Sequence, residues 1–285
     1  MDGMESVNWI GICRRAVARQ RELFAADRSA ASRTEYEGRG EGGDMSLVLD
    51  RRCEDIVFEE LEAGLAADGA PAVVAVSEER GEVSIGGSES ALKVVIDPID
   101  GSMNVRRTIP GHSLSIAIAD GDSMADVFFG FVHDFGPDEE WVARRGAGVT
   151  LDGSPLPEPA PDHGLEVVGL ESAEPGWVGP SIAALEGKAY RLRVVGSIAI
   201  SMSWVGAGRF DAMFSARPCR SVDAAASQLI ATEAGGAVDF GGIDAAQADL
   251  GLDARYTVAA ARSDEHLETV VAAQSAGPRI GERNG

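Results

Sequence analysis

The sequence predicts an α+β fold that has an N-terminal α+β domain and a C-terminal α/β domain. In the first half, helical hydrophobic spacing gives way to alternating segments joined by short turns, which is the pattern of an antiparallel meander. In the second half, strand-like and helical segments alternate, as in α/β layers. Four alternate prolines between residues 155 and 161 form a stiff connector. We therefore expect domains at residues 1–153 and 162–274, and a disordered tail at 275–285.

Length and composition indicate a globular chain with room for a large core. The chain has 285 residues, of which 45% are hydrophobic. No apolar run approaches the ~20 residues of a membrane span, and the first residues lack the basic segment and apolar core of a signal peptide. Three scattered cysteines show neither disulfide nor metal-site spacing. We expect a cytoplasmic protein without a membrane partner.

The chain is strongly acidic. Its net charge is −21, and only Lys93 and Lys188 are lysines among the 25 basic residues. Such a field disfavours nucleic acid as a partner, and it repels anionic substrates unless local cations overcome it. We interpret the charge as a halophilic adaptation, because screening at high salt shortens self-repulsion to a few ångströms. An acidic interaction surface is the alternative.

The first segments predict two helices and a strand around a glycine-rich loop. Apolar residues at helical spacing cover Ser6–Ala26. Arg28–Asp44 is polar and rich in glycine, so it is either a passive connector or a flap over a site. A second helix is expected from Asp50, a suitable N-cap, to Ala66. Ala72–Val76 is then expected to form a short buried strand.

The central stretch carries the chemistry of the first half. An apolar strand over Leu92–Ile96 is expected to stop at Asp97-Pro98, because proline cannot donate to a sheet ladder. Asp97 and Asp100 lie in this turn, and a helix over Met103–Arg107 follows. Carboxylates at a strand end can hold divalent cations, and free N–H groups of a helix start can hold a phosphate. In isolation, ordinary turn chemistry is the favoured interpretation.

The remaining segments follow the two-domain pattern. Antiparallel strands are expected at Ser113–Ala119, Met124–Val132 and Glu140–Ala143, with the end of the sheet at Gly146–Gly153. In the second half, strands are expected at Leu165–Leu170, Leu192–Val195, Phe210–Phe214 and Tyr256–Ala260. Helices are expected at Ser181–Leu185, Ser197–Gly206, Asp223–Ala234 and Asp264–Ala273, the last of them capped by Ser263.

Three short motifs follow one another along the chain. They are Ser77-Glu78-Glu79, Asp97-Pro98-Ile99-Asp100-Gly101-Ser102, and Ser221-Val222-Asp223-Ala224-Ala225-Ala226 followed by Thr232-Glu233-Ala234-Gly235-Gly236. Together they resemble the inositol monophosphatase superfamily, and they stand in that family's order. The resemblance spans about residue 6 to residue 273. It implies a layered α-β-α-β-α sugar-phosphatase fold and magnesium-dependent phosphatase activity.

The resemblance also implies roles for individual residues. The family's metal-binding carboxylates correspond to Glu78, Asp97, Asp100 and Asp223, and a metal-binding backbone carbonyl corresponds to Ile99. Ser102 and its acidic partner Asp50 correspond to the pair beside the attacking water, and Gly101 and Ser102 to the amides that cradle the phosphate. Four carboxylates suit two or three Mg²⁺ ions. Mn²⁺ is an alternative ion, and Li⁺ is a candidate inhibitor.

The substrate side is more similar to an archaeal group that acts on both fructose-1,6-bisphosphate and inositol phosphate. Val222 stands where many family members have tryptophan, and Ala216 where many inositol-specific members have glutamate. The substrate-binding residues that this resemblance implies are Arg193, Gly196, Ser197, Ile198 and Arg217, together with Gly101 and Ser102. Two alternatives stay open: Arg217 as a surface cation, and Arg193 as a member of an ion pair within the fold.

These features predict a Mg²⁺-dependent phosphatase that hydrolyses fructose-1,6-bisphosphate, inositol-1-phosphate or both by attack of a metal-activated water. A 3′-phosphoadenosine phosphatase of the same superfamily is one alternative, and a non-catalytic metal-binding homologue is another. The expected partner is a small-molecule phosphomonoester. We also expect a homodimer or homotetramer, since two-fold symmetric assemblies are common.

Overall fold

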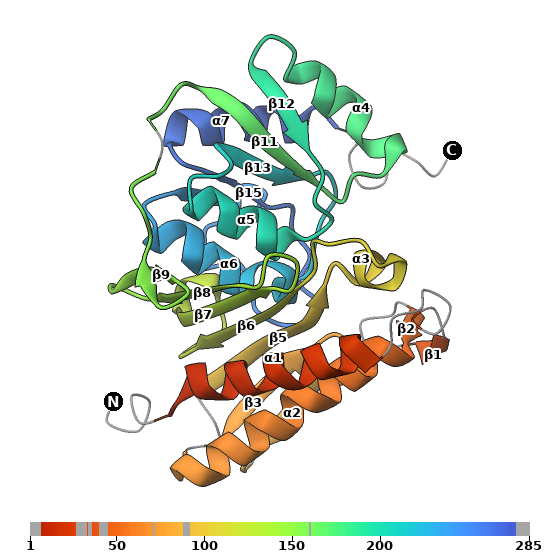
Figure 1. The fold of residues 1–285 in the computed structure, drawn as a ribbon. Coiled ribbons are helices and arrows are strands. Elements are labelled where there is room, and N and C mark those ends of the chain that lie inside the picture. Colours follow the sequence, from red (N-terminus) through yellow and green to blue (C-terminus); the bar gives the residue numbers. More distant parts are fainter. Residues whose placement is uncertain are drawn as a thin grey trace.

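The computed structural model describes residues 7–26, 33, 36–39, 45–70, 72–87, 92–159 and 161–277. Its elements stack in five layers, α-β-α-β-α (Figure 1). The outer helices on one side are α1 (Trp9–Ala26) and α2 (Val48–Asp68), and those on the other are α4 (Pro175–Ala184) and α7 (Asp264–Ser275). Between the two sheets lie α5 (Ile198–Gly206) and α6 (Ser221–Glu233). The predicted layered fold is confirmed.

The larger sheet has eight strands in the order β10-β9-β8-β7-β6-β5-β3-β4. Their bounds are β3 Val73–Ser77, β4 Gly81–Ile85, β5 Leu92–Asp100, β6 Ser113–Ala119, β7 Val127–Asp134, β8 Glu139–Arg144, β9 Gly148–Leu151 and β10 Ser154–Pro155. All neighbours are antiparallel except β3 and β5. The predicted meander is therefore present. Strand β7 begins later than expected, because Met124–Asp126 forms a short 3-10 helix.

The smaller sheet has five strands in the order β12-β11-β13-β15-β14. Their bounds are β11 Leu165–Glu171, β12 Ala189–Arg193, β13 Ala212–Ser215, β14 Ala237–Asp239 and β15 Ala259–Ala261. Strands β11, β12 and β13 are parallel, and α4 and α5 form parts of the connections between them. The alternation of strands and helices expected for the second half is confirmed. The sequence analysis missed β4 and β14.

Both faces of the larger sheet are buried. Val94 and Ile96 of β5 pack into the core formed with α1 and α2, whereas Val95 between them packs into the core formed with α5 and α6. Helix α6 lies very close to β7. A Cβ atom on Gly130 would come within 2.6 Å of the Ala226 carbonyl oxygen, so only glycine fits there. This close contact seats α6, which carries Asp223, on the sheet that carries Asp97.

Several expected boundaries are wrong for identifiable reasons. Strand β5 does not stop at Asp97-Pro98 but continues to Asp100. Its neighbour β3 pairs with it only as far as Ile96, so the missing N–H of Pro98 costs no ladder bond on that side. Asp50 is not an N-cap, because α2 begins at Val48 directly after β2 (Met45–Leu47) and Asp50 lies inside its first turn.

The N-terminal loop and the C-terminal end of the chain also differ in part from the prediction. The segment predicted as a loop over Arg28–Asp44 contains β1 (Tyr36–Arg39), which pairs with β2. Most of that segment, including the predicted flap, lies outside the described residues. Helix α7 continues to Ser275, and Ser263 caps it as predicted, because its hydroxyl accepts a hydrogen bond from the His266 N–H at 3.3 Å. Residues 278–285 of the predicted tail are outside the described residues.

No helix among the described residues has the length and apolar character of a membrane span. The domain boundary at the proline connector stays a prediction. Helices α5 and α6, which follow the connector, pack between the two sheets and share one core with residues of both. The site described next lies where these two parts of the chain meet.

Candidate active site

Three carboxylates from distant parts of the chain meet at one point. Asp97 and Asp100 at the end of β5 and Asp223 in the first turn of α6 each offer an oxygen atom, and these atoms all lie within 4.8 Å of one another. They line a cavity of about 360 Å³. The predicted residues Glu78, Asp50, Ile99, Gly101 and Ser102 line the same cavity. The tertiary structure thus brings together all the residues predicted to bind metal or activate water.

A β-bulge explains how Asp97 and Asp100 can serve one site. Asp97 pairs with Ser115 and Asp100 with Ser113, so three steps along β5 face two steps along β6. In a regular strand, residues three apart point to opposite faces. The extra residue shifts the alternation and places both carboxylates in the same cavity. The Asp97 carboxylate also accepts a hydrogen bond from the Ile99 N–H at 3.0 Å, which holds the bulge.

The turn from β5 into α3 (Ser102–Arg107) requires a glycine. Gly101 has a positive φ of 93°. A Cβ atom there would come within 2.7 Å of the Gly111 carbonyl oxygen and 3.1 Å of the Gly196 carbonyl oxygen. The close approach places Ser102, the first residue of α3, at the cavity wall beside Asp100.

Arg220 is a site residue that the sequence analysis did not nominate. Its backbone N–H donates to the Asp223 carboxylate at 2.7 Å, and its guanidinium donates to Glu78 at 2.5 Å. The guanidinium therefore connects the turn after β3 to the start of α6. Nothing in the local sequence separates Arg220 from the nearby Arg217, because only the folded chain shows which arginine reaches Glu78.

Burial raises the pKa of the three clustered carboxyl groups, and repulsion by neighbouring carboxylates adds to this for Asp97 and Asp100. For Asp97, burial is the main cause, and the charges of Asp100, Asp223 and Glu78 add to it, so that its pKa lies well above the usual value. Burial and the charge of Asp223 raise the pKa of Asp100 to about 8, against hydrogen bonds from Ser197 and Ala199. Burial also raises the pKa of Asp223.

This donor set fits a hard divalent cation. The residues offer only oxygen atoms, which Mg²⁺ and Mn²⁺ prefer. The raised pKa values show that three ionised carboxylates in this volume are costly without a compensating positive charge. A bound cation would remove that cost. Glu78 and the Ile99 carbonyl lie at the same cavity and could extend the ligand set.

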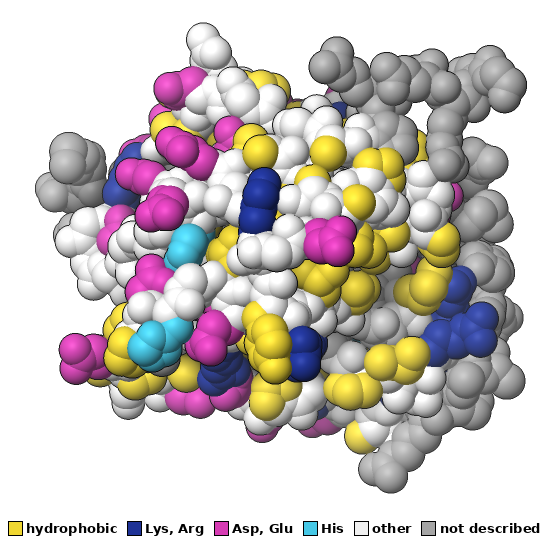
Figure 2. Space-filling view, turned by 90° about the horizontal axis from the view of Figure 1, so that it is seen from above, with side chains coloured by type: hydrophobic (Ala, Val, Ile, Leu, Met, Phe, Trp, Pro, Cys, Tyr) yellow, Lys and Arg dark blue, Asp and Glu magenta, His cyan; other side chains and the backbone are white. Residues whose placement is uncertain are grey.

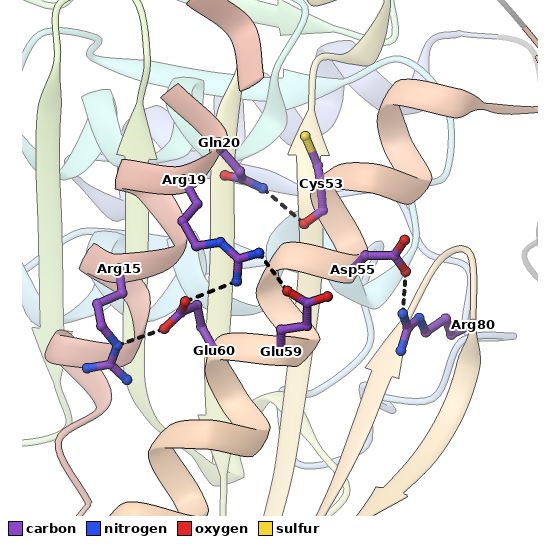
Figure 3. Close-up of polar contacts among 8 residues, drawn as sticks. All are labelled: Arg15, Arg19, Gln20, Cys53, Asp55, Glu59, Glu60 and Arg80. Carbon is purple, nitrogen blue, oxygen red and sulfur yellow. Dashed lines mark hydrogen bonds and ion pairs between the residues drawn. The ribbon is translucent and has the colours of Figure 1, made fainter. Parts of the chain in front are cut away.

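Helices α1 and α2 support the site from behind. The side-chain amide of Gln20 in α1 donates to the Pro98 carbonyl at 3.2 Å and to the Cys53 carbonyl at 3.4 Å. The second of these bonds is drawn in Figure 3, together with the ion pairs that connect α1 to α2. The fully buried Glu54 of α2 accepts from the backbone N–H groups of Glu79 and Arg80, which fixes the turn that carries Glu78.

A larger cavity of about 940 Å³ adjoins the carboxylate cluster. The two cavities share Met103, Asp100, Gly196, Arg220 and Asp223 in their walls. Of the predicted substrate residues outside the central motif, Gly196, Ile198 and Arg217 line the larger cavity. Arg255 and Glu171 line it too, and the sequence analysis nominated neither.

Arg193 and Ser197 are absent from both linings. The exposed Arg193 donates to the carbonyl of its neighbour Leu192 at 2.9 Å, so the predicted ion pair within the fold is not among its described contacts. Ser197 is buried, and its hydroxyl donates to Asp100 at 2.6 Å. Arg217 lies at the cavity wall, pairs with Glu174 at 2.7 Å and stacks over Trp177.

Comparison with known proteins agrees with this geometry. The sequence profile of the inositol monophosphatase family matches residues 10–277. A fructose-1,6-bisphosphatase/inositol-1-monophosphatase of Thermococcus kodakarensis is 32% identical over 203 residues, which are 70% of this chain and 72% of that protein. An inositol-1-monophosphatase of Mesorhizobium japonicum is 29% identical over 202 residues, 69% of this chain and 72% of the relative.

A solved structure shows the same fold. A crystal structure of an inositol monophosphatase–fructose 1,6-bisphosphatase superposes with a TM-score of 0.77 at 25% identity, covering 93% of this chain and 99% of the other. The family profile spans nearly all of the described chain, and the named relatives are phosphatases. The protein therefore belongs to the inositol monophosphatase family and is a phosphoric monoester hydrolase.

Proposed function

We propose that the protein is a Mg²⁺-dependent phosphatase that hydrolyses sugar or polyol phosphate monoesters, with fructose-1,6-bisphosphate and inositol-1-phosphate as the first candidates. The observation that carries this proposal is the convergence of Asp97, Asp100 and Asp223 within 4.8 Å, beside a much larger cavity. The name of the Thermococcus kodakarensis relative gives both activities, and that of the Mesorhizobium japonicum relative gives the inositol-1-monophosphatase activity.

In this proposal, Glu78, Asp97, Asp100, Asp223 and the Ile99 carbonyl hold two or three Mg²⁺ ions. Bound Mg²⁺ would lower the pKa of a coordinated water and neutralise charge on the phosphate and the leaving oxygen. Asp50 and Ser102 share the cavity with these ligands, which supports their predicted role of orienting the attacking water and accepting its proton. Backbone N–H groups of Gly101 and Ser102 are the proposed phosphate contacts.

The larger cavity is the proposed place for the rest of the substrate. Arg217 and Arg255 put positive charge in its wall, which suits the hydroxyls or the second phosphate of a bisphosphate. Ala216, where many inositol-specific members have glutamate, is not in the lining of this cavity, so the proposed preference rests on the two arginines. We therefore propose a preference for fructose-1,6-bisphosphate over inositol-1-phosphate.

The test is phosphate release by the purified protein from fructose-1,6-bisphosphate, inositol-1-phosphate and 3′-phosphoadenosine 5′-phosphate, with and without Mg²⁺. We expect Mg²⁺-dependent release from the first two substrates, and loss of release in Asp97→Asn because a ligand and its charge are removed. Asp120→Asn is the matched control. Asp120 follows the last residue of β6, which pairs with the start of β5 and not with the end that carries Asp97, and it forms an ion pair with Arg145. Full turnover in a folded Asp97→Asn protein would refute the mechanism.

The oligomeric state and location also remain proposals. Exposed large hydrophobic side chains include Ile182, Tyr190 and Val194, from α4 and the β12 region. Figure 2 shows hydrophobic side chains gathered on the end of the molecule seen from above. This surface supports the proposed homodimer or homotetramer, because large exposed apolar patches mark interaction sites. We also propose that the protein is cytoplasmic.

A further inference from the structure

Glu171, the last residue of β11, is a buried carboxylate that the proposed reaction does not use. Only 1% of its surface is exposed. It lies in the wall of the larger cavity and is not a member of the Asp97–Asp100–Asp223 cluster. An ionised carboxylate in the protein interior is costly unless hydrogen bonds compensate it, so its partners indicate what it does.

The Glu171 carboxylate binds the turn between β12 and α5. One of its oxygens accepts from the Val195 N–H at 3.1 Å and from the Ser201 hydroxyl at 2.5 Å. The other oxygen accepts from the Gly196 N–H at 2.8 Å. Gly196 has a positive φ of 88°, a backbone conformation that residues other than glycine rarely adopt. The carboxylate thus holds the turn in one backbone conformation, which the conformational preferences of the local sequence alone would not fix.

The other side of this turn holds a member of the carboxylate cluster. The Ser197 hydroxyl and the Ala199 N–H both donate to the same oxygen of Asp100, at 2.6 and 2.7 Å. The Ser197 hydroxyl in turn accepts from the Ile200 N–H at 3.1 Å, which ties it to the start of α5. Hydrogen bonds on both sides of the turn, joined by its backbone, therefore connect Glu171 to Asp100.

We propose that Glu171 is a positioning residue, whose carboxylate fixes the turn at Val195–Ser197 so that Ser197 and Ala199 hold Asp100 in the orientation that completes the carboxylate cluster. Gly196, which lines both cavities, is held by the same carboxylate. One residue therefore aligns the metal side of the site with the substrate side. This inference rests on the proposed function, because it takes Asp100 to be a metal ligand.

The test compares Glu171→Gln and Glu171→Asp with the wild-type protein. Glutamine keeps the shape, but its NH₂ group would face an N–H donor, so the turn loses part of its support. We expect about a tenfold to hundredfold loss in kcat/KM for Glu171→Gln, and a similar weakening of Mg²⁺ binding measured by calorimetry without substrate. Glu171→Asp keeps the charge on a shorter side chain, and partial recovery of both quantities is expected.

Asp211→Asn is the matched control. Asp211 is also a buried carboxylate that holds β11, since it accepts from the Val167 N–H at 2.8 Å, but it lies at the opposite end of that strand and pairs with Arg262. A purely structural role predicts lower melting temperatures for both Glu171→Gln and Asp211→Asn without a specific effect on Mg²⁺ affinity.

Unchanged Mg²⁺ affinity and unchanged kcat/KM per folded molecule of Glu171→Gln would overturn the inference. The proposed function is judged separately, by Mg²⁺-dependent phosphate release from the wild-type protein. If the wild-type protein is active and Glu171→Gln equals it, only the positioning role fails. If the wild-type protein neither binds Mg²⁺ nor releases phosphate, the proposed function fails first.

Discussion

Asp97, Asp100 and Asp223, the proposed metal ligands, are close enough to destabilise the folded protein when all three are ionised. Their carboxyl groups are buried close together. Burial raises the pKa of all three, and the charges of neighbouring carboxylates raise those of Asp97 and Asp100 further. In the metal-free protein this repulsion opposes folding, whereas a cation bound only to the folded state would stabilise it.

The Asp223→Asn variant tests this opposition. Asparagine can still accept the hydrogen bond from the Arg220 N–H, but it removes one of the clustered charges. We expect the metal-free variant at pH 8 to be more stable than wild type by about 1–2 kcal/mol, and to lose the stabilisation by Mg²⁺. Thermal unfolding with and without Mg²⁺ measures both effects. A metal-free variant less stable than wild type would show that Asp223 mainly supports the fold.

Arg220 adds a second residue-scale effect, because its guanidinium pairs with Glu78, a proposed metal ligand. A guanidinium at this position competes with a metal ion for Glu78, and its positive charge repels the ion. We expect Arg220→Gln to bind Mg²⁺ about tenfold more tightly in calorimetry, which corresponds to about 1.4 kcal/mol. Arg209→Gln is the control, since Arg209 pairs with Glu139 on another strand. Weaker Mg²⁺ binding in Arg220→Gln would instead mean that Arg220 orients Glu78 for the metal.

The arrangement of β11, β12 and α5 depends on the carboxylate of Glu171, whose pKa is raised. Burial raises the pKa of Glu171 to about 7, from an ordinary value of 4.5. Because the folded-state pKa is the higher one, the folded protein binds the proton more tightly. The contribution to stability is therefore complete below pH 4.5 and is lost as the pH rises to about 7.

This shift predicts a pH-dependent difference between wild type and Glu171→Gln. From pH 4.5 to pH 8, wild type should lose on the order of 3 kcal/mol of unfolding free energy more than the variant, which has no group to titrate. Denaturant unfolding of both proteins at several pH values measures the difference. Parallel curves for the two proteins across this range would show that Glu171 has an ordinary pKa.

The segment between β13 and α6 contains one of the proposed substrate-binding residues. Arg217 in this segment lines the larger cavity and pairs with Glu174, at the start of α4. We expect Arg217→Ala to raise KM for fructose-1,6-bisphosphate more than for inositol-1-phosphate. The difference between the two increases should correspond to about 1–3 kcal/mol of binding free energy, the contribution of a charged hydrogen bond. Arg191→Ala, on the exposed face of β12, is the control. Equal losses on both substrates would assign Arg217 a structural role.

For the whole molecule, the net charge of −21 is the dominant electrostatic feature. Self-repulsion among 46 acidic and only 25 basic residues opposes the compact state in dilute buffer. We expect the melting temperature and the activity to rise between about 0.1 and 2 M KCl at constant Mg²⁺, because salt screens this repulsion. Differential scanning calorimetry tests the stability part. A flat melting curve over this range would mean that the charge serves solubility alone.

The amino-acid sequence was sufficient to predict the layered fold class, most of the helices and strands, and which carboxylates belong to the cluster. Hydrophobic periodicity reports which face of a segment is buried, so the helices α1, α2, α6 and α7 and the meander could be predicted. The three motifs were sufficient to identify the family. Strands β4 and β14 were missed because they are short and only partly buried, so they lack the apolar run that marked the similarly short β3.

The tertiary structure decided how these residues make one site. The bulge between Asp97 and Asp100 depends on pairing with β6, and the continuation of β5 through Pro98 depends on where β3 ends. The seat of α6 on the sheet, at Gly130, brings Asp223 to them. The partners of Arg220 and Glu171 are also distant in sequence. Periodicity describes each segment against a generic core, whereas these contacts depend on which segments pack together.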